Sequence, residues 1–281
     1  MLKLLALSVR VSRHCGVRSS LMSYQAIRVH FREPVCVVQF ARPEVGNTIN
    51  DRLVDECHEV LASCEARPAG AAPVTVVVFE GSPEVFCLGA DFQGVHDDLA
   101  AGTAVDRGPD RLYDLWLKLA EGPFVTVAHV RGKVNAGGVG FVAASDIVLA
   151  DRTAQFSLSE LLFGLFPACV LPFLIRRIGV QRAHYLTLMT KPIAVQEAQD
   201  WGLVDAHDPD SASLLHRHLL RLRRLSKPAI TRYKRYMHDL ADVLRHARPL
   251  ALAANREVFS DPDNLKGIFR FVEQGKFPWE A

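Results

Sequence analysis

Gly132-Lys133-Val134-Asn135-Ala136-Gly137-Gly138-Val139-Gly140 is the stretch of sequence that decides the fold of this chain. It follows the β-branched run Val125–Val130, and small residues that favour a helix come after it. A second turn of small residues, Phe86-Cys87-Leu88-Gly89-Ala90-Asp91, follows another such run, Val74–Phe79. Turns of this kind at strand ends can bring two backbone N–H groups to one point, where they would hold an oxygen that gains negative charge.

Strand and helix signals alternate through the first two thirds of the chain. Gln25–Val29 and Val35–Phe40 predict an antiparallel pair, and Asn50–Cys64 predicts a helix with Asn50 as its N-cap. The later runs continue the alternation, which predicts right-handed βαβ units and an α/β fold with ligands at the carboxyl ends of the strands. The later strands and helices are expected at Val74–Phe79, Asp110–Leu119, Val125–Val130 and Phe141–Ala150, the last leading from a helix of small residues into the strand Ile147–Leu149.

The sequence beyond Val170 is mostly helical, and it gives a division of the chain into three parts. We predict a core domain over residues 23–200 and a C-terminal helical region over 201–281. Residues 1–22 are basic and lack acidic residues, which is typical of a mitochondrial presequence, but Met22 directly before the first strand favours a start codon placed too far upstream. Under either interpretation residues 1–22 lie outside the fold. Helices are expected at Val170–Ile178, Gln181–Met189, Val195–Trp201, Leu214–Leu225, Ala229–Asp242 and Pro249–Phe259.

Composition excludes several classes of protein. The chain has 281 residues, 49% hydrophobic and 23% charged, which suffices for a full core, and its formal net charge of +2 is too small to indicate nucleic-acid binding. The six cysteines show no paired spacing, so we expect neither a metal site nor a disulfide framework. Apolar runs stay shorter than the roughly 18 residues of a membrane span.

Several linked motifs resemble the crotonase (enoyl-CoA hydratase/isomerase) superfamily, over residues 24–281. Further phrases look closest to its dehydratase branch, which serves the HMG-synthase cassette that installs β-methyl branches in bacterial polyketides. The superfamily motifs are Cys87–Asp91, Gly132–Gly140, Ser145-Asp146-Ile147, Ala154-Gln155-Phe156 and Glu197–Val204. The branch-level phrases are Asn47–Asp51, Arg131–Gly138, Phe156–Pro172 and Phe277–Glu280.

This resemblance implies a ClpP/crotonase-like spiral of ββα units with a C-terminal helical region. It also implies a homotrimer or a dimer of trimers in the bacterial cytoplasm, with no cofactor beyond the phosphopantetheine that carries the substrate. The implied partner is an acyl carrier protein, and neither a nucleic acid nor a membrane is expected.

The family pattern also assigns candidate site residues. It implies that the N–H groups of Ala90 and Gly137 form an oxyanion hole for a thioester carbonyl. Glu160 matches one of the two catalytic glutamates of hydratases, and its apolar neighbours should raise its pKa toward the value an acid/base needs. The other glutamate would fall at Gly140, which has no side chain. Elimination with one carboxylate is therefore favoured over two-carboxylate hydration.

Two polar side chains beside the oxyanion turns have open roles. Asn135 and Asp91 could orient a leaving hydroxyl or a substrate carboxylate, so both are candidate catalytic residues. Asp91 is equally suited to cap the helix that follows it, and Asn135 could hold neighbouring backbone groups instead.

The strongest basic cluster lies between Arg217 and Arg235. One interpretation is the solvated face of two amphipathic helices. The other is that Arg223 and Arg224 dock an acidic carrier protein. Without a stacking aromatic platform, nucleic-acid binding explains the cluster less well.

The favoured function is a dehydratase that converts 3-hydroxy-3-methylglutaryl-acyl carrier protein to the 3-methylglutaconyl thioester through an enolate. One alternative is another crotonase enzyme, either a decarboxylase of the same cassette or a hydratase or isomerase of CoA thioesters. The more distant alternative is a non-catalytic member that binds an acyl carrier or RNA. A retained Glu160 with both oxyanion turns argues against the last.

Overall fold

The computed structural model describes residues 24–66, 70–101 and 108–280. The extension predicted for residues 1–22 lies outside these ranges. Within them, no helix is both long enough and apolar enough to cross a membrane.

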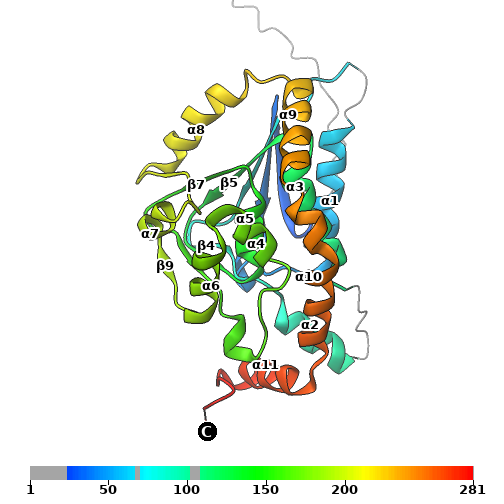
Figure 1. Cartoon of the computed structure of the whole chain (residues 1–281), viewed down its shortest axis with the longest axis vertical. Coiled ribbons are helices and arrows are strands. Elements are labelled where there is room, and N and C mark those ends of the chain that lie inside the picture. Colours follow the sequence, from blue (N-terminus) through cyan, green and yellow to red (C-terminus); the bar gives the residue numbers. More distant parts are fainter. Residues whose placement is uncertain (1–23, 67–69, 102–107, 281) are drawn as a thin grey trace, which may run out of the picture.

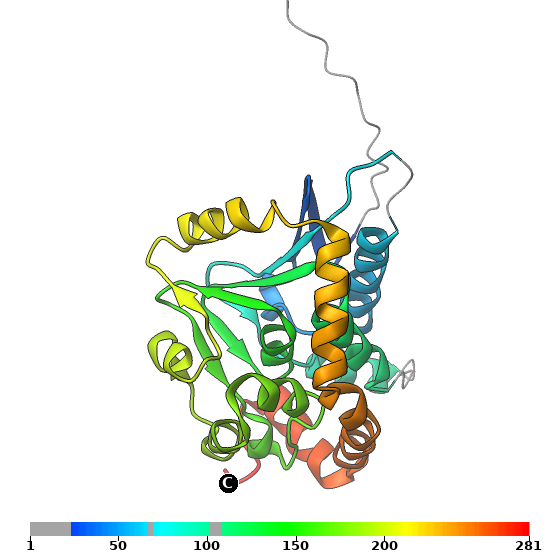
Figure 2. The same ribbon diagram turned by 45° about the horizontal axis from the view of Figure 1, so that its top comes forward.

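The larger sheet has six strands in the order β1-β2-β3-β5-β7-β10. The predicted pair β1/β2 is antiparallel, while β2/β3, β3/β5, β5/β7 and β7/β10 are parallel. The valine-rich strands β3 and β5 are buried because helices cover both faces of the sheet (Figures 1 and 2). The strands are β1 (Ile27–Arg32), β2 (Val35–Phe40), β3 (Val76–Glu80), β5 (Val125–Val130), β7 (Ile147–Ala150) and β10 (Ala206–His207).

A second sheet of short strands, in the order β4-β6-β8-β9, was not predicted from the residue pattern. Strands of two or three residues carry too little alternation to be recognised in a sequence. β4, β6 and β8 each follow a strand of the larger sheet, so the chain passes from one sheet to the other three times. This repeat confirms the predicted α/β spiral. The strands are β4 (Val85–Cys87), β6 (Lys133–Asn135), β8 (Gln155–Ser157) and β9 (Ile193–Ala194).

The expected helices are present with small shifts at their ends, except that the helix expected from Pro249 begins six residues earlier, at Val243, and contains Pro249. The side chain of Asn50 accepts a hydrogen bond from Leu53 N–H, so the predicted N-cap is confirmed. One further helix, α11, closes the chain and was not predicted. The helices are α1 (Asp51–Glu65), α2 (Phe92–Ala101), α3 (Asp110–Glu121), α4 (Gly137–Ala144), α5 (Leu171–Ile178), α6 (Val180–Met189), α7 (Val195–Asp200), α8 (Ser211–Leu222), α9 (Lys227–Leu240), α10 (Val243–Ser260) and α11 (Pro262–Gln274), with the 3₁₀ helices η1 (Pro43–Val45) and η2 (Glu160–Phe163).

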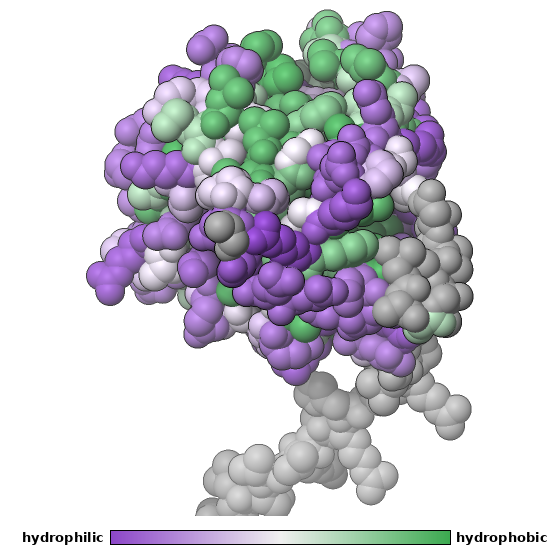
Figure 3. Space-filling model, turned by 90° about the horizontal axis from the view of Figure 1, so that it is seen from below, coloured by the Kyte–Doolittle hydropathy of each residue, from purple (hydrophilic) through white to green (hydrophobic). Residues whose placement is uncertain are grey.

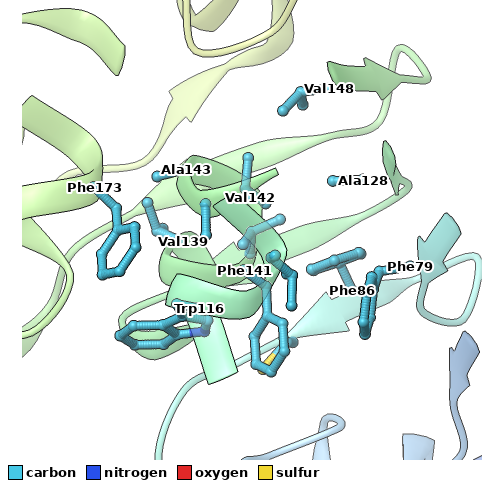
Figure 4. Packing of buried hydrophobic residues seen from close by; sticks show 14 of the residues in the cluster. Phe79, Phe86, Trp116, Ala128, Val139, Phe141, Val142, Ala143, Val148 and Phe173 are labelled. Carbon is cyan, nitrogen blue, oxygen red and sulfur yellow. The ribbon is translucent and has the colours of Figure 1, made fainter. Parts of the chain in front are cut away.

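Helix α4 lies inside the core and is enclosed by aromatic rings. Figure 4 shows Trp116 and Phe173 against this helix, and Phe141 projecting from it toward Phe79 and Phe86. The ring centroids of Trp116 lie 6.0 Å from Phe141 and 5.8 Å from Phe173. Because α4 is buried from Gly138 to Ala144, only small or apolar residues fit along it.

The C-terminal helices pack directly on the core. Lys234 of α9 is buried and donates to Asp146 Oδ2 at 2.7 Å and to the carbonyls of Leu119 and Phe124. Burial lowers the pKa of this ammonium, while Asp146 opposes that change. On the other side of the sheet, Leu214 of α8 packs against β3, β5 and β7. The boundary at residue 200 stays a prediction.

Candidate active site

The two glycine turns touch each other. Gly89 has a φ of +95°, and a Cβ added there would lie 2.7 Å from Ala136 Cβ and 3.2 Å from Gly137 N. A side chain would therefore be strained by the backbone conformation and blocked by the opposite turn. Because Gly89 has no side chain, Ala90 and Gly137 lie on adjoining turns.

The N–H groups of Ala90 and Gly137 are both available to a ligand. Gly89 C=O and Asp91 N–H bond to Ile49, so Ala90 N–H, between them in an extended bridge, points the other way. Gly137 is the first residue of α4, where an N–H has no acceptor within the helix. Neither N–H donates to an acceptor within the described ranges of the chain. Two free donors at the positive end of a helix suit a developing oxyanion.

Pairing between β6 and β8 connects this site to Glu160. Asn135 pairs with Ser157, and Ala136 N–H donates to Ser157 C=O at 3.0 Å. The chain then enters η2, whose first residue is Glu160. The acid/base candidate therefore follows directly from the strand that is bonded to the oxyanion turn.

The carboxyl group of Glu160 is largely shielded from solvent. The residue as a whole is only partly buried, but its Oε2 is fully enclosed and has no hydrogen-bond partner among the described residues. Burial raises the pKa of this carboxyl from 4.5 to about 7, although the N–H groups of Ser159 and Glu160 oppose the rise. A carboxyl with this pKa can both accept and return a proton near neutral pH.

Asn135 lies between the oxyanion turn and the Glu160 turn. Its Nδ2 donates to Ser159 Oγ at 2.8 Å, and its Oδ1 accepts from Ser157 Oγ at 2.8 Å. Ser159 is the residue before Glu160. In this conformation the amide supports the segment that carries the carboxyl group.

Both oxygens of Asp91 have partners. Oδ1 accepts from Gly94 N–H at 3.1 Å near the start of α2, and Oδ2 accepts from Arg42 Nη2 at 2.7 Å. Arg42 Nη1 also donates to Thr48 C=O. Of the two roles predicted for Asp91, the geometry favours the helix cap, which fixes the residue next to Ala90.

Trp116 occupies the space beside Gly140. A Cβ added to Gly140 would lie 2.3 Å from Trp116 Cζ2, so the ring leaves no room for a glutamate side chain. Packing therefore excludes a second carboxylate at this position. The indole N–H is buried and lacks a hydrogen-bond partner among the described residues.

The predicted carrier-docking residues lie far from these groups. Arg223 lines a cavity of about 370 Å³ with Pro34, Pro73 and Pro228, near the beginnings of β2 and β3. Figure 1 shows the connection from α8 to α9 at the end of the molecule opposite α11. The structure does not bring Arg223 and Arg224 together with the oxyanion turns in this chain, and their docking role stays a prediction.

Several residues that shape the site were not singled out in the sequence. Arg42, Ser157, Ser159 and Trp116 act through contacts with residues distant in the chain. Arg42 and Asp91, for example, are separated by 49 positions. No local spacing could have identified such a pair.

Comparisons with known proteins identify the family of this chain. Residues 30–281 match the family described as enoyl-CoA hydratase/isomerase. The chain is 59% identical over 260 residues to the bacillaene synthase dehydratase PksH of Bacillus subtilis, covering 92% of this chain and 98% of that protein. It is 30% identical over 196 residues to the mevalonyl-coenzyme A hydratase SIDH of Beauveria bassiana, covering 66% of this chain and 68% of that protein.

Solved structures show the same fold. A polyketide-biosynthesis enoyl-CoA hydratase (pksH) from Bacillus subtilis superposes with a TM-score of 0.87 at 59% identity, covering 91% of this chain and 100% of that chain. An enoyl-CoA hydratase from Mycobacterium avium subsp. paratuberculosis superposes with a TM-score of 0.77 at 23% identity, covering 92% and 99%. The second likeness shows the fold alone.

Proposed function

Because the chain belongs to the enoyl-CoA hydratase/isomerase family, we propose that it is a hydro-lyase of polyketide biosynthesis, which dehydrates 3-hydroxy-3-methylglutaryl-acyl carrier protein to the 3-methylglutaconyl thioester. The observation that carries the proposal is the combination of two N–H groups, at Ala90 and Gly137, that donate to no acceptor in the described part of the chain, with one buried carboxyl group. The likeness to a dehydratase named for bacillaene synthase supports the reaction and the pathway class.

The reaction needs one acid/base and one oxyanion hole. The thioester carbonyl oxygen accepts from Ala90 N–H and Gly137 N–H, which stabilise the enolate formed when Glu160 removes the α-proton. The electron pair of the enolate then forms the double bond and expels the β-hydroxyl group. Glu160 returns the proton to this oxygen, water leaves, and the carboxylate is regenerated. The same carboxyl group serves both steps because its pKa lies at about 7.

A single carboxyl group suits this chain because a second has no space. Trp116 fills the position beside Gly140 where a second acid would project. Within the proposal, Asn135 and Asp91 are positioning residues. Asn135 supports the turn before Glu160, and Asp91 anchors the start of α2 next to Ala90.

The acyl carrier protein and the oligomer belong to the same proposal. Apolar side chains on α6, α9 and α10 stay exposed in the single chain, among them Val180, Leu188, Tyr236, Leu240 and Leu250. Figure 3, which views the molecule from the α11 end, shows apolar residues gathered over one part of that face. Surfaces of this kind support assembly into a homotrimer or a dimer of trimers. A monomer by light scattering would contradict the assembly.

The testing experiment follows the mass of the carrier. The purified protein is incubated with acyl carrier protein loaded with the 3-hydroxy-3-methylglutaryl group, beside a Glu160→Gln variant, and the loaded carrier is measured by intact mass spectrometry. Loss of one water with the wild type, and not with the variant, is the expected result.

Other outcomes select among the alternatives. Loss of carbon dioxide from a 3-methylglutaconyl carrier would identify the decarboxylase of the same cassette. Turnover of CoA thioesters but not of the loaded carrier would identify a CoA hydratase or isomerase. If Arg223→Glu with Arg224→Glu left carrier turnover unchanged, the proposed docking role of these residues would be wrong.

A further inference from the structure

The turn that carries Glu160 is too short to be stable without contacts from the rest of the chain. η2 has four residues, and the side chain of Ser159, its N-cap residue, makes no capping hydrogen bond. Its backbone bonds are local, such as Leu162 N–H to Ser159 C=O at 3.1 Å. A single 3₁₀ turn is marginal without tertiary contacts, so its position depends on what packs against it.

The ring of Phe163, in this turn, packs against two aromatic rings from the C-terminal end of the chain, and a third ring stacks behind them. The ring centroid of Phe163, the last residue of η2, lies 5.2 Å from that of Phe271 and 5.7 Å from that of Phe277. Phe271 and Phe277 lie 4.9 Å apart, and Trp279 stacks on Phe277 at 4.7 Å. We call Phe163, Phe271, Phe277 and Trp279 the aromatic clamp.

Helix α11 also contacts the residues that directly follow Phe163. A Cβ added to Gly164 would lie 2.0 Å from Asn264 Oδ1, so Asn264 lies directly against the residue that ends η2. The next residue, Leu165, is buried in a cluster with Val258 of α10 and Ile268 of α11. Contacts with α10 and α11 therefore hold the C-terminal end of the turn.

The same helix packs on α2, which begins two residues after Ala90. His96 Nε2 of α2 lies 3.0 Å from Glu273 Oε1 of α11, and its ring centroid lies 5.1 Å from that of Phe269. Helix α11 thus touches both the element behind the oxyanion turn and the turn that carries the acid/base group. Figure 1 shows α11 at the bottom of the molecule, at the end opposite the connection from α8 to α9.

We infer that α11 and residues 275–280 position the acid/base group for the reaction. The aromatic clamp excludes water from the Glu160 carboxyl group and keeps this group aligned with the oxyanion turns. The inference rests on the proposed function only for its effect on turnover. Side chains three residues apart in a 3₁₀ helix lie on the same face, so Phe163, which packs on these rings, shares a face of η2 with Glu160. We therefore expect that removing a ring lets the turn move and admits water to the carboxyl group. Water would stabilise the carboxylate and return its pKa toward 4.5, which weakens it as a base.

The test is a graded series of clamp variants. Phe277→Ala removes the ring that contacts the other three, Trp279→Ala removes the outermost and 62%-exposed ring, and Phe277→Tyr keeps the shape. Tyr233→Ala, which removes a 64%-exposed ring on α9, is the matched control. We expect Phe277→Ala to lower kcat about tenfold with little change in KM. Trp279→Ala should lower kcat by a smaller factor, and Phe277→Tyr should retain the activity of the wild type.

A second readout does not require turnover. Carboxyl ¹³C NMR follows the titration of Glu160, assigned by its loss in Glu160→Gln. In Phe277→Ala the midpoint should move down from about 7 toward 4.5 and stay in place in Tyr233→Ala. An unchanged midpoint in a folded Phe277→Ala protein would overturn the inference, even if the wild type proved to be a dehydratase. A shifted midpoint in a protein that dehydrates no thioester would sustain the clamp and reject the proposed function instead. If Phe277→Ala does not fold, the same two outcomes are decided with Trp279→Ala.

Discussion

The two halves of the candidate site are held in place by different kinds of contact. The oxyanion half consists of N–H groups at Ala90 and Gly137, positioned where one backbone turn rests on another. The acid/base half is one side chain, Glu160, on a short turn whose last residue, Phe163, packs against the rings of Phe271 in α11 and of Phe277 beyond it. The first half depends on the absence of a Cβ, whereas the second depends on packing from distant parts of the chain. Different substitutions should therefore disable them.

Replacing the acid/base group should have the largest effect on turnover. We expect Glu160→Gln to lower kcat by about 10²–10⁴-fold, the usual contribution of a positioned acid/base, with substrate binding retained. Kinetics on the loaded carrier measure this, with the exposed Glu197→Gln as the control. Retention of full activity would show that the base lies elsewhere.

Adding one methyl group at the contact between the turns should come next. Gly89→Ala would force Ala136 and Gly137 away and lower kcat by about 10²–10³-fold, as expected when one oxyanion donor is lost. Gly179→Ala is the matched control, because Gly179 also has a positive φ of +79° but no atom within 4 Å of an added Cβ. Equal losses in both variants would attribute the effect to backbone strain alone.

The buried carboxyl group should also make stability depend on pH. Its pKa is about 7 in the folded protein against an ordinary 4.5, so between these pH values the folded state binds more protons than the unfolded state. The free energy of unfolding therefore falls as pH rises from 4.5 to 7, and this contribution levels off above that range. Between pH 4 and pH 8, the wild type should therefore lose about 2–3 kcal/mol of unfolding free energy that the Glu160→Gln variant does not lose. Urea unfolding at both pH values measures the difference, and parallel pH curves would contradict a buried carboxylate.

The smallest expected effect concerns the position that lacks the second carboxylate. Gly140→Ala should destabilise the protein by about 1–3 kcal/mol, because the rigid indole of Trp116 cannot give way, even though alanine favours a helix. Adding Trp116→Phe should recover part of this loss. A neutral Gly140→Ala in urea unfolding would mean that the space is open and that a second acid could be introduced.

The fold was largely readable because its main signals are local. Buried β-branched runs mark β3 and β5, and the Asn50 cap marks the start of α1. The second sheet was not predicted because its strands have only two or three residues. Helix α11 was not predicted either, although Asp261 caps it and Gly275 ends it. Its apolar face becomes meaningful only beside η2 and α2.

The site was predictable in part for the same reason. The sequence by itself determined where two backbone turns, or a turn and a ligand, could approach closely, because Gly89 and Gly137 have no side chain. It also placed Glu160 in an apolar segment. Only the tertiary structure decided that the two turns touch, that Asp91 pairs with Arg42 and caps α2, and that Trp116 excludes a second acid. The physical reason is range: conformational preference belongs to single residues and short windows, whereas pKa, hydrogen-bond partners and free space depend on groups that only folding brings together.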